Sequence, residues 1–337
     1  MKRVLITGGA GFMGYHLAQK LEKKLFYIDL IDDLSRGKID EDFKSLIKKK
    51  KVSFYNIDIN SNKFFLLKKR NYDYIFHFAA IVGVKNVIKK PFEVLTKNIF
   101  LLERILSFSK KQKKLKRLIF VSSSEVYAGT LKKFGLKFPT PEETFLTLNN
   151  LNDQRSTYMI SKIYGEAMCH HSKVSFTIVR PHNVYGPRMG YAHVIPELFV
   201  KSQYSKKKIL KVNSPYHKRT FCYIDDAINM IINLSKSKLE KNKIFNIGVD
   251  KNEIKIIDLA KLILVILKKK LKILPMKITQ GSPYRRCPSM RKYRKVVNKI
   301  KFTSLKEGLQ NTLAWYSKNK KYNILWFHYL FYAYHQA

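Results

Sequence analysis

The sequence predicts an α/β protein built on a doubly wound parallel sheet, followed by a smaller C-terminal α/β domain. Short β-type runs alternate with amphipathic helical stretches through the first half of the chain, and this alternation is typical of parallel sheets with helices on both faces. The 337 residues, of which 45% are hydrophobic, are enough for one large domain with a smaller companion. The same hydrophobic content argues against global disorder.

Each expected element has its own signal in the chain. Short β-type runs predict strands, and amphipathic stretches between them predict helices. The expected strands are Arg3–Thr7, Leu25–Ile31, Val52–Ile57, Tyr74–Phe78, Leu118–Ser122 and Ser175–Arg180. The expected helices are Tyr15–Lys23, Val94–Lys110, Thr157–Ser172, Ile224–Ser235, Ile256–Lys268 and Leu305–Lys318.

These elements suggest three parts of the chain. Residues 1–180 are expected to form the sheet-based domain, with a segment near 217–250 that returns to it, and residues 181–320 mainly the smaller domain. The tail over 321–337 is dense in aromatic residues but shorter than the roughly 18 apolar residues that span a bilayer. We expect the tail to pack on the body or on a partner subunit, with anchoring at a membrane surface as the alternative.

Targeting signals and cysteines point to an ordinary intracellular protein. No apolar run is long enough to span a membrane, and the first residues lack the apolar stretch of a signal peptide. We therefore expect a cytoplasmic protein without a membrane span. Cys169, Cys222 and Cys287 lie far apart, which favours three reduced structural thiols over a metal site or a disulfide framework.

The charge of the chain is unusual. Its 66 Lys and Arg against 24 Asp and Glu give a formal net charge of +42. Such a balance can indicate binding to nucleic acid or anionic lipid. The lysines are scattered along the chain, however, mostly near expected helix ends and loops. We therefore expect no specific nucleic-acid partner, but we expect the positive field to steer an anionic substrate.

A glycine-rich segment directly follows the first expected strand. Gly8, Gly11 and Gly14 let the backbone turn tightly and approach a pyrophosphate, and the next helix offers its free N–H groups to the phosphates. This context predicts a dinucleotide site of the Rossmann type. Asp32 follows at the distance expected of a carboxylate that accepts the ribose hydroxyls and disfavours a 2′-phosphate, which favours NAD. Arg36 nearby weakens that distinction, and the alternative role of Asp32 is a turn cap.

Successive motifs resemble one known family. The segments Gly8–Gly14, Asp32–Ser35, Asp58-Ile59 and His77–Ala80, together with Asn98, are similar to the signatures of extended short-chain dehydrogenases, and more narrowly to NAD-dependent nucleotide-sugar epimerases and dehydratases. The resemblance extends to about Tyr316. It implies NAD as cofactor, a nucleotide sugar as substrate and a homodimer formed through helices that include Thr157–Ser172. The cofactor residues that it implies are Gly8, Gly11, Phe12, Met13, Gly14, Asp32, Asp58, Ile59, Phe78, Ala79, Ala80, Asn98, Tyr158 and Lys162.

A Tyr-x-x-x-Lys segment supplies the expected base. Residues four apart share one face of a helix, so the Lys162 ammonium is expected to favour the phenolate of Tyr158 and to lower its pKa from near 10. The alternative is an exposed helix face without a catalytic role. By resemblance, Ser123 at the end of the fifth strand shares the proton, with Ser124 as the fallback. Glu125 occupies the place where related dehydratases and decarboxylases carry a glutamate that assists proton transfer.

The substrate side is also identified by resemblance. Asn183 lies in an Arg-x-x-Asn-x-Tyr-Gly-Pro segment and is expected to contact the diphosphate of a nucleotide sugar. Arg219 and Arg286 lie in two further segments that resemble phosphate-binding stretches, although Ser289 stands where aspartate is usual. Guanidinium groups pair bidentately with phosphate, which suits both arginines.

These residues predict oxidation of the sugar to a transient 4-keto intermediate. The motifs are shared by 4-epimerases, decarboxylases and 4,6-dehydratases, and we expect a 4-epimerase first, with the other two as alternatives. A protein that binds NAD or nucleic acid without catalysis is the alternative of another class. The presence of Ser123, Tyr158 and Lys162 argues against it.

Overall fold

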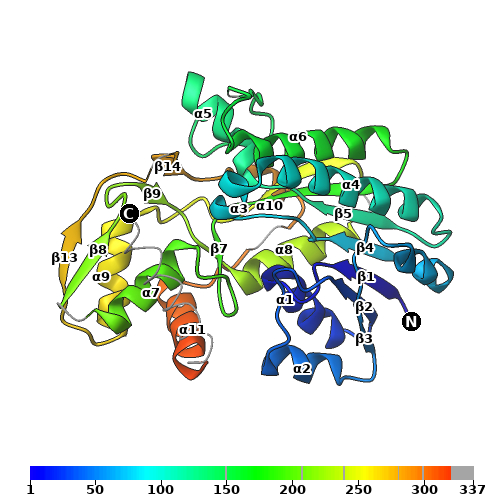
Figure 1. Cartoon of the computed structure of the whole chain (residues 1–337), viewed down its shortest axis with the longest axis horizontal. Coiled ribbons are helices and arrows are strands. Elements are labelled where there is room, and N and C mark those ends of the chain that lie inside the picture. The colour runs from blue at the N-terminus through cyan, green and yellow to red at the C-terminus, as the bar shows by residue number, and fades with distance from the viewer. Residues whose placement is uncertain (149, 206–207, 238–239, 280, 298–299, 320–337) are drawn as a thin grey trace.

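A parallel seven-stranded sheet forms the centre of the molecule, seen in the computed structural model of the chain (Figure 1). The structure describes residues 1–148, 150–205, 208–237, 240–279, 281–297 and 300–319; the predicted aromatic tail, 321–337, lies outside them. The strand order is β11-β6-β5-β4-β1-β2-β3. These strands are β1 (Arg3–Thr7), β2 (Tyr27–Asp32), β3 (Val52–Asn56), β4 (Tyr74–His77), β5 (Arg117–Val121), β6 (Phe176–Pro181) and β11 (Lys243–Ile247).

The six strands predicted in the first half are all present, with ends shifted by one or two residues or not at all. Strands β1 to β3 are added towards one edge of the sheet, and β4 to β6 towards the other. The strand order therefore reverses between β1 and β4, which are neighbours. In open α/β sheets such a point opens a crevice beyond the carboxyl ends of the strands. The seventh strand, β11, pairs with β6 from Lys243↔Thr177 to Ile247↔Pro181.

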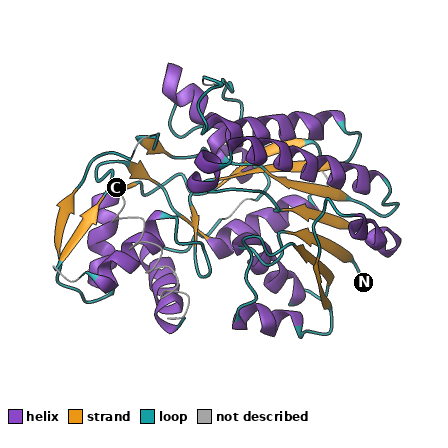
Figure 2. Cartoon of the chain, viewed as in Figure 1, coloured by secondary structure: helices purple, strands orange, loops and turns teal. Residues whose placement is uncertain are grey.

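Helices cover both faces of the sheet (Figure 2). In the view of Figure 1, α4 and α6 lie above the sheet, and α1 and α8 below it. The helices that belong to this body are α1 (Phe12–Glu22), α2 (Glu41–Ile47), α3 (Val84–Lys89), α4 (Pro91–Lys110), α5 (Ala128–Phe134), α6 (Ser156–His171) and α8 (Ile224–Lys236), with the 3-10 helices η1 (Asn62–Arg70) and η2 (Ser124–Tyr127). This arrangement confirms the predicted doubly wound α/β class.

The alternation of side chains along each strand explains the two layers of helices. On β1, Val4 and Ile6 join a core cluster with α1 and α8, whereas Leu5 between them joins a second cluster with α4 and α6. The same division recurs on β5, where Ile119 faces the first cluster and Phe120 the second. Both faces of a parallel sheet are buried in this way, which is why its strands read as continuous apolar runs.

The rest of the chain lies beyond the carboxyl ends of the strands, at the left of Figure 1. It packs into the same core cluster as α1 and α8. Its helices are α7 (Val194–Tyr204), α9 (Ile256–Ile266) and α11 (Leu305–Lys318), whereas α10 (Arg291–Arg294) returns to the sheet and packs beside β11 and α8. Its short strands are β7 (Val184–Tyr185), β8 (Ile209–Val212), β9 (Lys218–Arg219), β10 (Cys222–Tyr223), β12 (Ile254–Lys255), β13 (Lys272–Pro275) and β14 (Arg285–Arg286).

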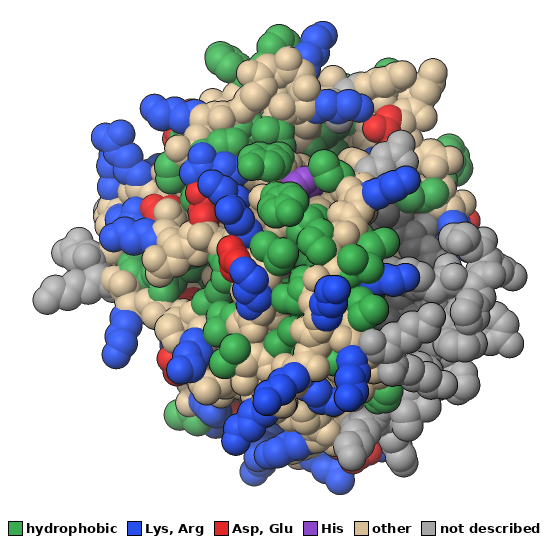
Figure 3. Space-filling model, turned by 90° about the vertical axis from the view of Figure 1, so that its left-hand side faces the viewer, with side chains coloured by type: hydrophobic (Ala, Val, Ile, Leu, Met, Phe, Trp, Pro, Cys, Tyr) green, Lys and Arg blue, Asp and Glu red, His purple; other side chains and the backbone are tan. Residues whose placement is uncertain are grey.

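Surface charge and cysteines agree with the sequence. On the face shown in Figure 3, Lys and Arg side chains spread among apolar and neutral ones and do not gather into a single stripe. Cys169, Cys222 and Cys287 are buried and unpaired. Among the described residues, no helix combines the length and the apolar character that crossing a membrane would require.

Candidate active site

One large cleft beyond the carboxyl ends of the strands brings together almost all predicted site residues. Its lining comes from both the sheet body and the C-terminal part of the chain. The predicted residues that line it are Gly8, Gly11, Phe12, Met13, Gly14, Asp32, Asp58, Ile59, Phe78, Ala79, Ala80, Ser123, Glu125, Tyr158, Lys162, Asn183, Arg219 and Arg286.

Asn98 is the exception among the predicted cofactor residues, because it does not line the cleft. Its side chain is buried on α4 and is used by the protein itself. The Oδ1 atom accepts from the N–H of Ile81 at 2.7 Å, and Nδ2 donates to the Ile81 carbonyl and to Ser161 Oγ. Asn98 therefore supports the loop after β4 from behind. The position of Asn98 in a family motif did not reveal whether the side chain contacts the cofactor or supports this loop.

The glycine turn between β1 and α1 is tight and leaves no room for side chains. Gly8 adopts a left-handed φ of +68°, and a Cβ there would come within 2.9 Å of the Ala79 N atom. A Cβ on Gly14 would overlap the carbonyl oxygen of Gly8. Gly11 caps α1 without a side chain, so the cap residue provides no acceptor for the first-turn N–H groups. This arrangement fits a dinucleotide, whose pyrophosphate such N–H groups bind.

Asp32 links the end of β2 to this turn. Its Oδ2 accepts from the N–H of Ala10 at 3.0 Å and its Oδ1 from the N–H of Leu34 at 2.9 Å. Burial raises its pKa, although both hydrogen bonds oppose the rise. The turn-cap role left open by the sequence is thus present. Asp32 also accepts from the N–H of Gly11, but a carboxylate has about four acceptor positions, which leaves the ribose-binding role open as well.

Arg36 is a cleft residue whose importance the sequence did not reveal. It follows Asp32 on the loop after β2 and lines the cleft. Burial lowers its pKa, while the charges of Tyr158 and Asp32 act to raise it. A cation on the cleft wall, within electrostatic reach of Asp32 and Tyr158, suits the negative charge of a dinucleotide. The only sequence signal was its closeness to Asp32.

Tyr158 and Lys162 lie one turn apart on α6, as predicted. The Nζ atom of Lys162 donates to the carbonyl oxygen of Val121 at 2.9 Å and lies 5.7 Å from the centre of the Tyr158 ring. Ser123, at the end of β5, accepts from the N–H of Glu125 and acts on the phenol of Tyr158 through a side-chain hydrogen bond. The base, the hydroxyl and the amine thus face one part of the cleft.

The pKa of Tyr158 is shifted upwards, opposite to the direction expected from the sequence. Burial raises it to about 12, and the side chain of Ser123 and the charge of Arg36 lower it only in part. The neighbouring Lys162 Nζ lies 5.7 Å from the ring centre of Tyr158, and burial lowers its own pKa to about 8. The predicted fall of the Tyr158 pKa is therefore not seen in the protein without a bound cofactor, where burial outweighs the opposing interactions.

Glu125 forms an ion pair with Arg286 in the cleft. Their side chains meet at 2.6 Å between Oε1 and Nη2. The charge of Arg286 lowers the pKa of Glu125 despite its desolvation, and Arg155 and Arg219 act in the same direction. Glu125 is therefore an ionised carboxylate within a group of three arginines. Arg155 carried no signal in the sequence, because only folding brings it here.

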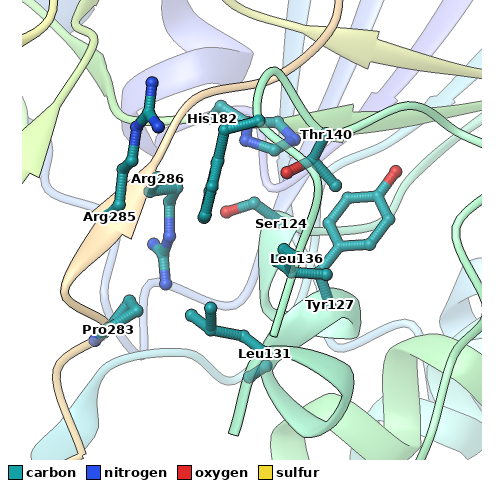
Figure 4. A pocket seen from close by; sticks show the side chains of 11 residues that line it. Ser124, Tyr127, Leu131, Leu136, Thr140, His182, Pro283, Arg285 and Arg286 are labelled. Carbon is teal, nitrogen blue, oxygen red and sulfur yellow. The ribbon is translucent and has the colours of Figure 1, made fainter. Parts of the chain in front are cut away.

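A small pocket adjoins the cleft at this ion pair (Figure 4). Ser124, Leu131 and Arg286 line both the pocket and the cleft. The guanidinium of Arg286 points into the pocket towards Leu131, whereas that of Arg285 points away from it. The guanidinium of Arg285 pairs with Glu253 instead.

The predicted substrate residues lie on the C-terminal side of the cleft. Asn183 has a left-handed φ of 43°, and its Nδ2 donates to the carbonyl oxygen of Thr220 at 2.9 Å. Arg219 donates to the carbonyl oxygens of Lys218 and Tyr284. Burial and the charge of Arg286 lower its pKa to about 9, because two cations share this site. An anion would relieve that repulsion.

Comparison with known proteins places this geometry in a family. Residues 4–248 match the model of the NAD dependent epimerase/dehydratase family. The UDP-N-acetyl-alpha-D-glucosaminuronate decarboxylase of Bacillus cytotoxicus is 30% identical over 94% of this chain and 98% of its own length. The human dTDP-D-glucose 4,6-dehydratase is 26% identical over 94% of this chain and 91% of its own.

Solved structures agree with these relatives. The UDP-glucuronic acid 4-epimerase of Bacillus cereus, solved with UDP-glucuronic acid and NAD, has a TM-score of 0.80 and 26% identity, and the match covers 94% of this chain and 99% of that one. These findings confirm the family resemblance, the enzyme class and NAD as cofactor. The chain belongs to the NAD-dependent epimerase/dehydratase family.

Proposed function

We propose that this enzyme oxidises a nucleotide sugar at carbon 4 to a transient ketone, and that its substrate is a nucleotide hexuronate, which it decarboxylates. The observation that carries the proposal is the ion pair of Glu125 and Arg286 within a group of three arginines, beside Tyr158 and Ser123. A diphosphate accounts for part of this positive charge. A sugar carboxylate would account for the rest, since guanidinium groups bind carboxylates bidentately.

The first step uses residues from both sides of the cleft. Tyr158, with Ser123 beside it, takes the proton of the 4-hydroxyl, and Lys162 holds positive charge next to the phenol. NAD, when bound along the glycine turn, supplies the reversible acceptor for the hydride of carbon 4. We assign NAD binding to the cleft residues predicted from the sequence and to Arg36. Asn98 would support the loop after β4 and would not contact NAD itself. Asn183, Arg219 and Arg286 hold the diphosphate and the sugar.

Decarboxylation needs little further machinery once the ketone exists. A 4-ketone with a carboxylate on carbon 5 is a β-keto acid. The bond between carbons 5 and 6 breaks, its electron pair passes towards the ketone, carbon dioxide leaves, and carbon 5 then takes a proton. Return of the hydride to carbon 4 would close the redox balance. The arginines hold the carboxylate in place, and Glu125 balances their charge.

The ionised state of Glu125 bears on the alternatives. A 4,6-dehydratase needs a base that removes the proton of carbon 5 and an acid for the departing 6-hydroxyl, and the lowered pKa of Glu125 suits the first role and not the second. The 4-epimerase favoured by the sequence stays the second candidate. It is supported by the structural likeness to the UDP-glucuronic acid 4-epimerase, whose substrate is also a hexuronate.

The proposal is tested with purified protein, NAD and a panel of nucleotide sugars that contains matched pairs of uronates and neutral sugars. We expect a uronate to lose carbon dioxide, seen by mass spectrometry, and the neutral partner to stay unchanged. Unchanged mass with inverted carbon 4 by NMR would instead identify the epimerase. Turnover of neutral sugars alone would contradict the uronate.

Quaternary structure and domain roles are part of the same proposal. We propose a homodimer formed through α4 and α6, since Phe92 and Phe100 on α4 and Tyr164 on α6 are large and exposed. Residues 1–180 with 217–250 would hold NAD, and 181–320 mainly the substrate. Light scattering that gives a monomer would contradict the dimer, and an unchanged dimer mass in Phe100→Lys would contradict the interface through α4.

A further inference from the structure

Beneath the cleft, Glu166 connects three elements that carry site residues. It lies on α6 one turn beyond Lys162 and is 4% exposed. Its Oε1 accepts from Ser122 Oγ on the β5 side at 2.6 Å and from Arg180 Nε on β6 at 2.9 Å. Its Oε2 accepts from Arg180 Nη2 at 2.6 Å. One carboxylate therefore ties α6 to the ends of β5 and β6.

Arg180 extends these contacts to β11, the edge strand of the sheet next to β6. Its Nη1 donates to Tyr127 Oη at 2.7 Å and to the carbonyl oxygen of Glu142 at 3.0 Å. Tyr127 in turn donates to Oδ1 of Asn246 on β11 at 3.0 Å. Neither Glu166 nor Arg180 is among the residues that line the cleft. Their effect on the reaction must therefore pass through the residues that they hold.

We propose that Glu166 is a positioning residue, which holds the β5 end that carries Ser123 in register with Tyr158 and Lys162 on α6, and whose charge keeps Lys162 an ammonium. The contribution to turnover rests on the proposed function, whereas the effect on Lys162 does not. The geometry supports it because Ser122, which Glu166 binds, directly precedes Ser123 in the chain.

The electrostatic part follows from the surroundings of Lys162. Burial lowers its pKa to about 8, and the carboxylate of Glu166 opposes that fall. The other charged or titratable groups packed around this region are His77 on β4, Tyr127 on η2, Glu142 in the following loop, Arg180 on β6 and Cys169 on α6. Burial lowers the pKa of His77 and raises those of Tyr127, Glu142 and Cys169, so it disfavours a charge on each of them.

The direct test is the titration of Lys162 in protein labelled with ¹³C at lysine Cε. Exposed lysines titrate near pH 10.4, so a resonance that titrates near pH 8 stands apart, and its absence in Lys162→Arg assigns it. In Glu166→Gln we expect this pKa to fall by about one unit, the lower end of the effect of an opposite charge nearby. This measurement requires no turnover, so it succeeds or fails independently of the proposed reaction.

Two further variants distinguish the loss of the Glu166 charge from a general loss of stability. Glu166→Gln alone leaves the Arg180 cation buried without its partner, so the double variant Glu166→Gln/Arg180→Gln is measured alongside, and we expect the lower Lys162 pKa in both. Glu166→Asp keeps the charge but shortens the reach to Ser122, so it should keep the Lys162 pKa near the wild-type value while kcat falls.

On an accepted nucleotide sugar, kcat should fall about a hundredfold in Glu166→Gln, the cost expected of a displacement near 1 Å, with KM and NAD affinity unchanged. A Lys162 pKa that stays at the wild-type value in the folded double variant would overturn the electrostatic part. Wild-type kcat in Glu166→Asp and in the double variant would overturn the positioning part.

Discussion

Replacing Lys162 with methionine should make the folded protein more stable while it removes turnover. Lys162 is 5% exposed, and burial lowers its pKa from 10.5 to about 8. At 1.36 kcal/mol per pKa unit, holding the buried ammonium at pH 7 costs the folded state about 3 kcal/mol. The variant also loses the hydrogen bond from Nζ to Val121, worth about 1 kcal/mol. We expect a net gain of about 2 kcal/mol.

The pH dependence of this gain has a definite sign. Because the pKa of Lys162 in the folded state lies below its value in the unfolded chain, the unfolded chain binds more protons between pH 8 and 10.5. Wild-type stability should therefore rise with pH across this window relative to Lys162→Met. The advantage of the variant is complete below about pH 8 and shrinks towards pH 10.5.

Urea unfolding at pH 7 and pH 10 measures both effects. Lys97→Met serves as the control, because Lys97 is exposed on α4 and its ion pair with Glu93, at 3.7 Å, lies on the surface. A Lys162→Met protein that is no more stable than wild type at pH 7 would refute the reasoning. An advantage that is equally large at pH 10 would refute it too.

Three other substitutions test the cleft. Tyr158→Phe should abolish turnover and leave NAD affinity by calorimetry within about twofold of wild type; full activity would exclude Tyr158 as the base. Gly14→Ala should weaken NAD binding at least about tenfold, because its Cβ overlaps the Gly8 carbonyl oxygen. Gly190→Ala, whose Cβ would meet no atom of the described residues within 4 Å, should bind NAD normally. Arg36→Ala should weaken NAD binding about tenfold, and less at high salt; an unchanged affinity would place Arg36 away from the pyrophosphate.

Long periodic segments of the fold could be predicted closely. Leu305–Lys318 and Arg3–Thr7 match α11 and β1, because each buries a regular apolar pattern. Helices α1 and α4 begin three residues earlier than expected, since Phe12–Gly14 had been assigned to the turn and Pro91 occupies a first position that suits proline. The two-residue strands β7, β9, β10, β12 and β14 carry no local signal. They exist only because distant segments pair.

The cleft was predictable for a different reason. Many of its residues occur in motifs that follow successive strands, and the carboxyl ends of parallel strands all lie at one edge of the sheet, so the sequence indicated that these motifs meet there. Asn98 shows the limit of this reasoning, because a motif position does not reveal whether a side chain faces the cleft or supports it from behind. Arg155 shows the other limit, since it belongs to no motif and acts on Glu125 only across space.

By itself, the sequence determined the six main strands, the long periodic helices and where a dinucleotide can lie, because periodicity and the glycine turn are local properties of the chain. The tertiary structure alone decided the charges. Whether Tyr158, Lys162 and Glu125 gain or lose protons depends on burial and on partners such as Arg36, Glu166 and Arg286, which only folding brings near them. Electrostatic interactions depend on distance and surroundings in space, and spacing along the chain specifies neither.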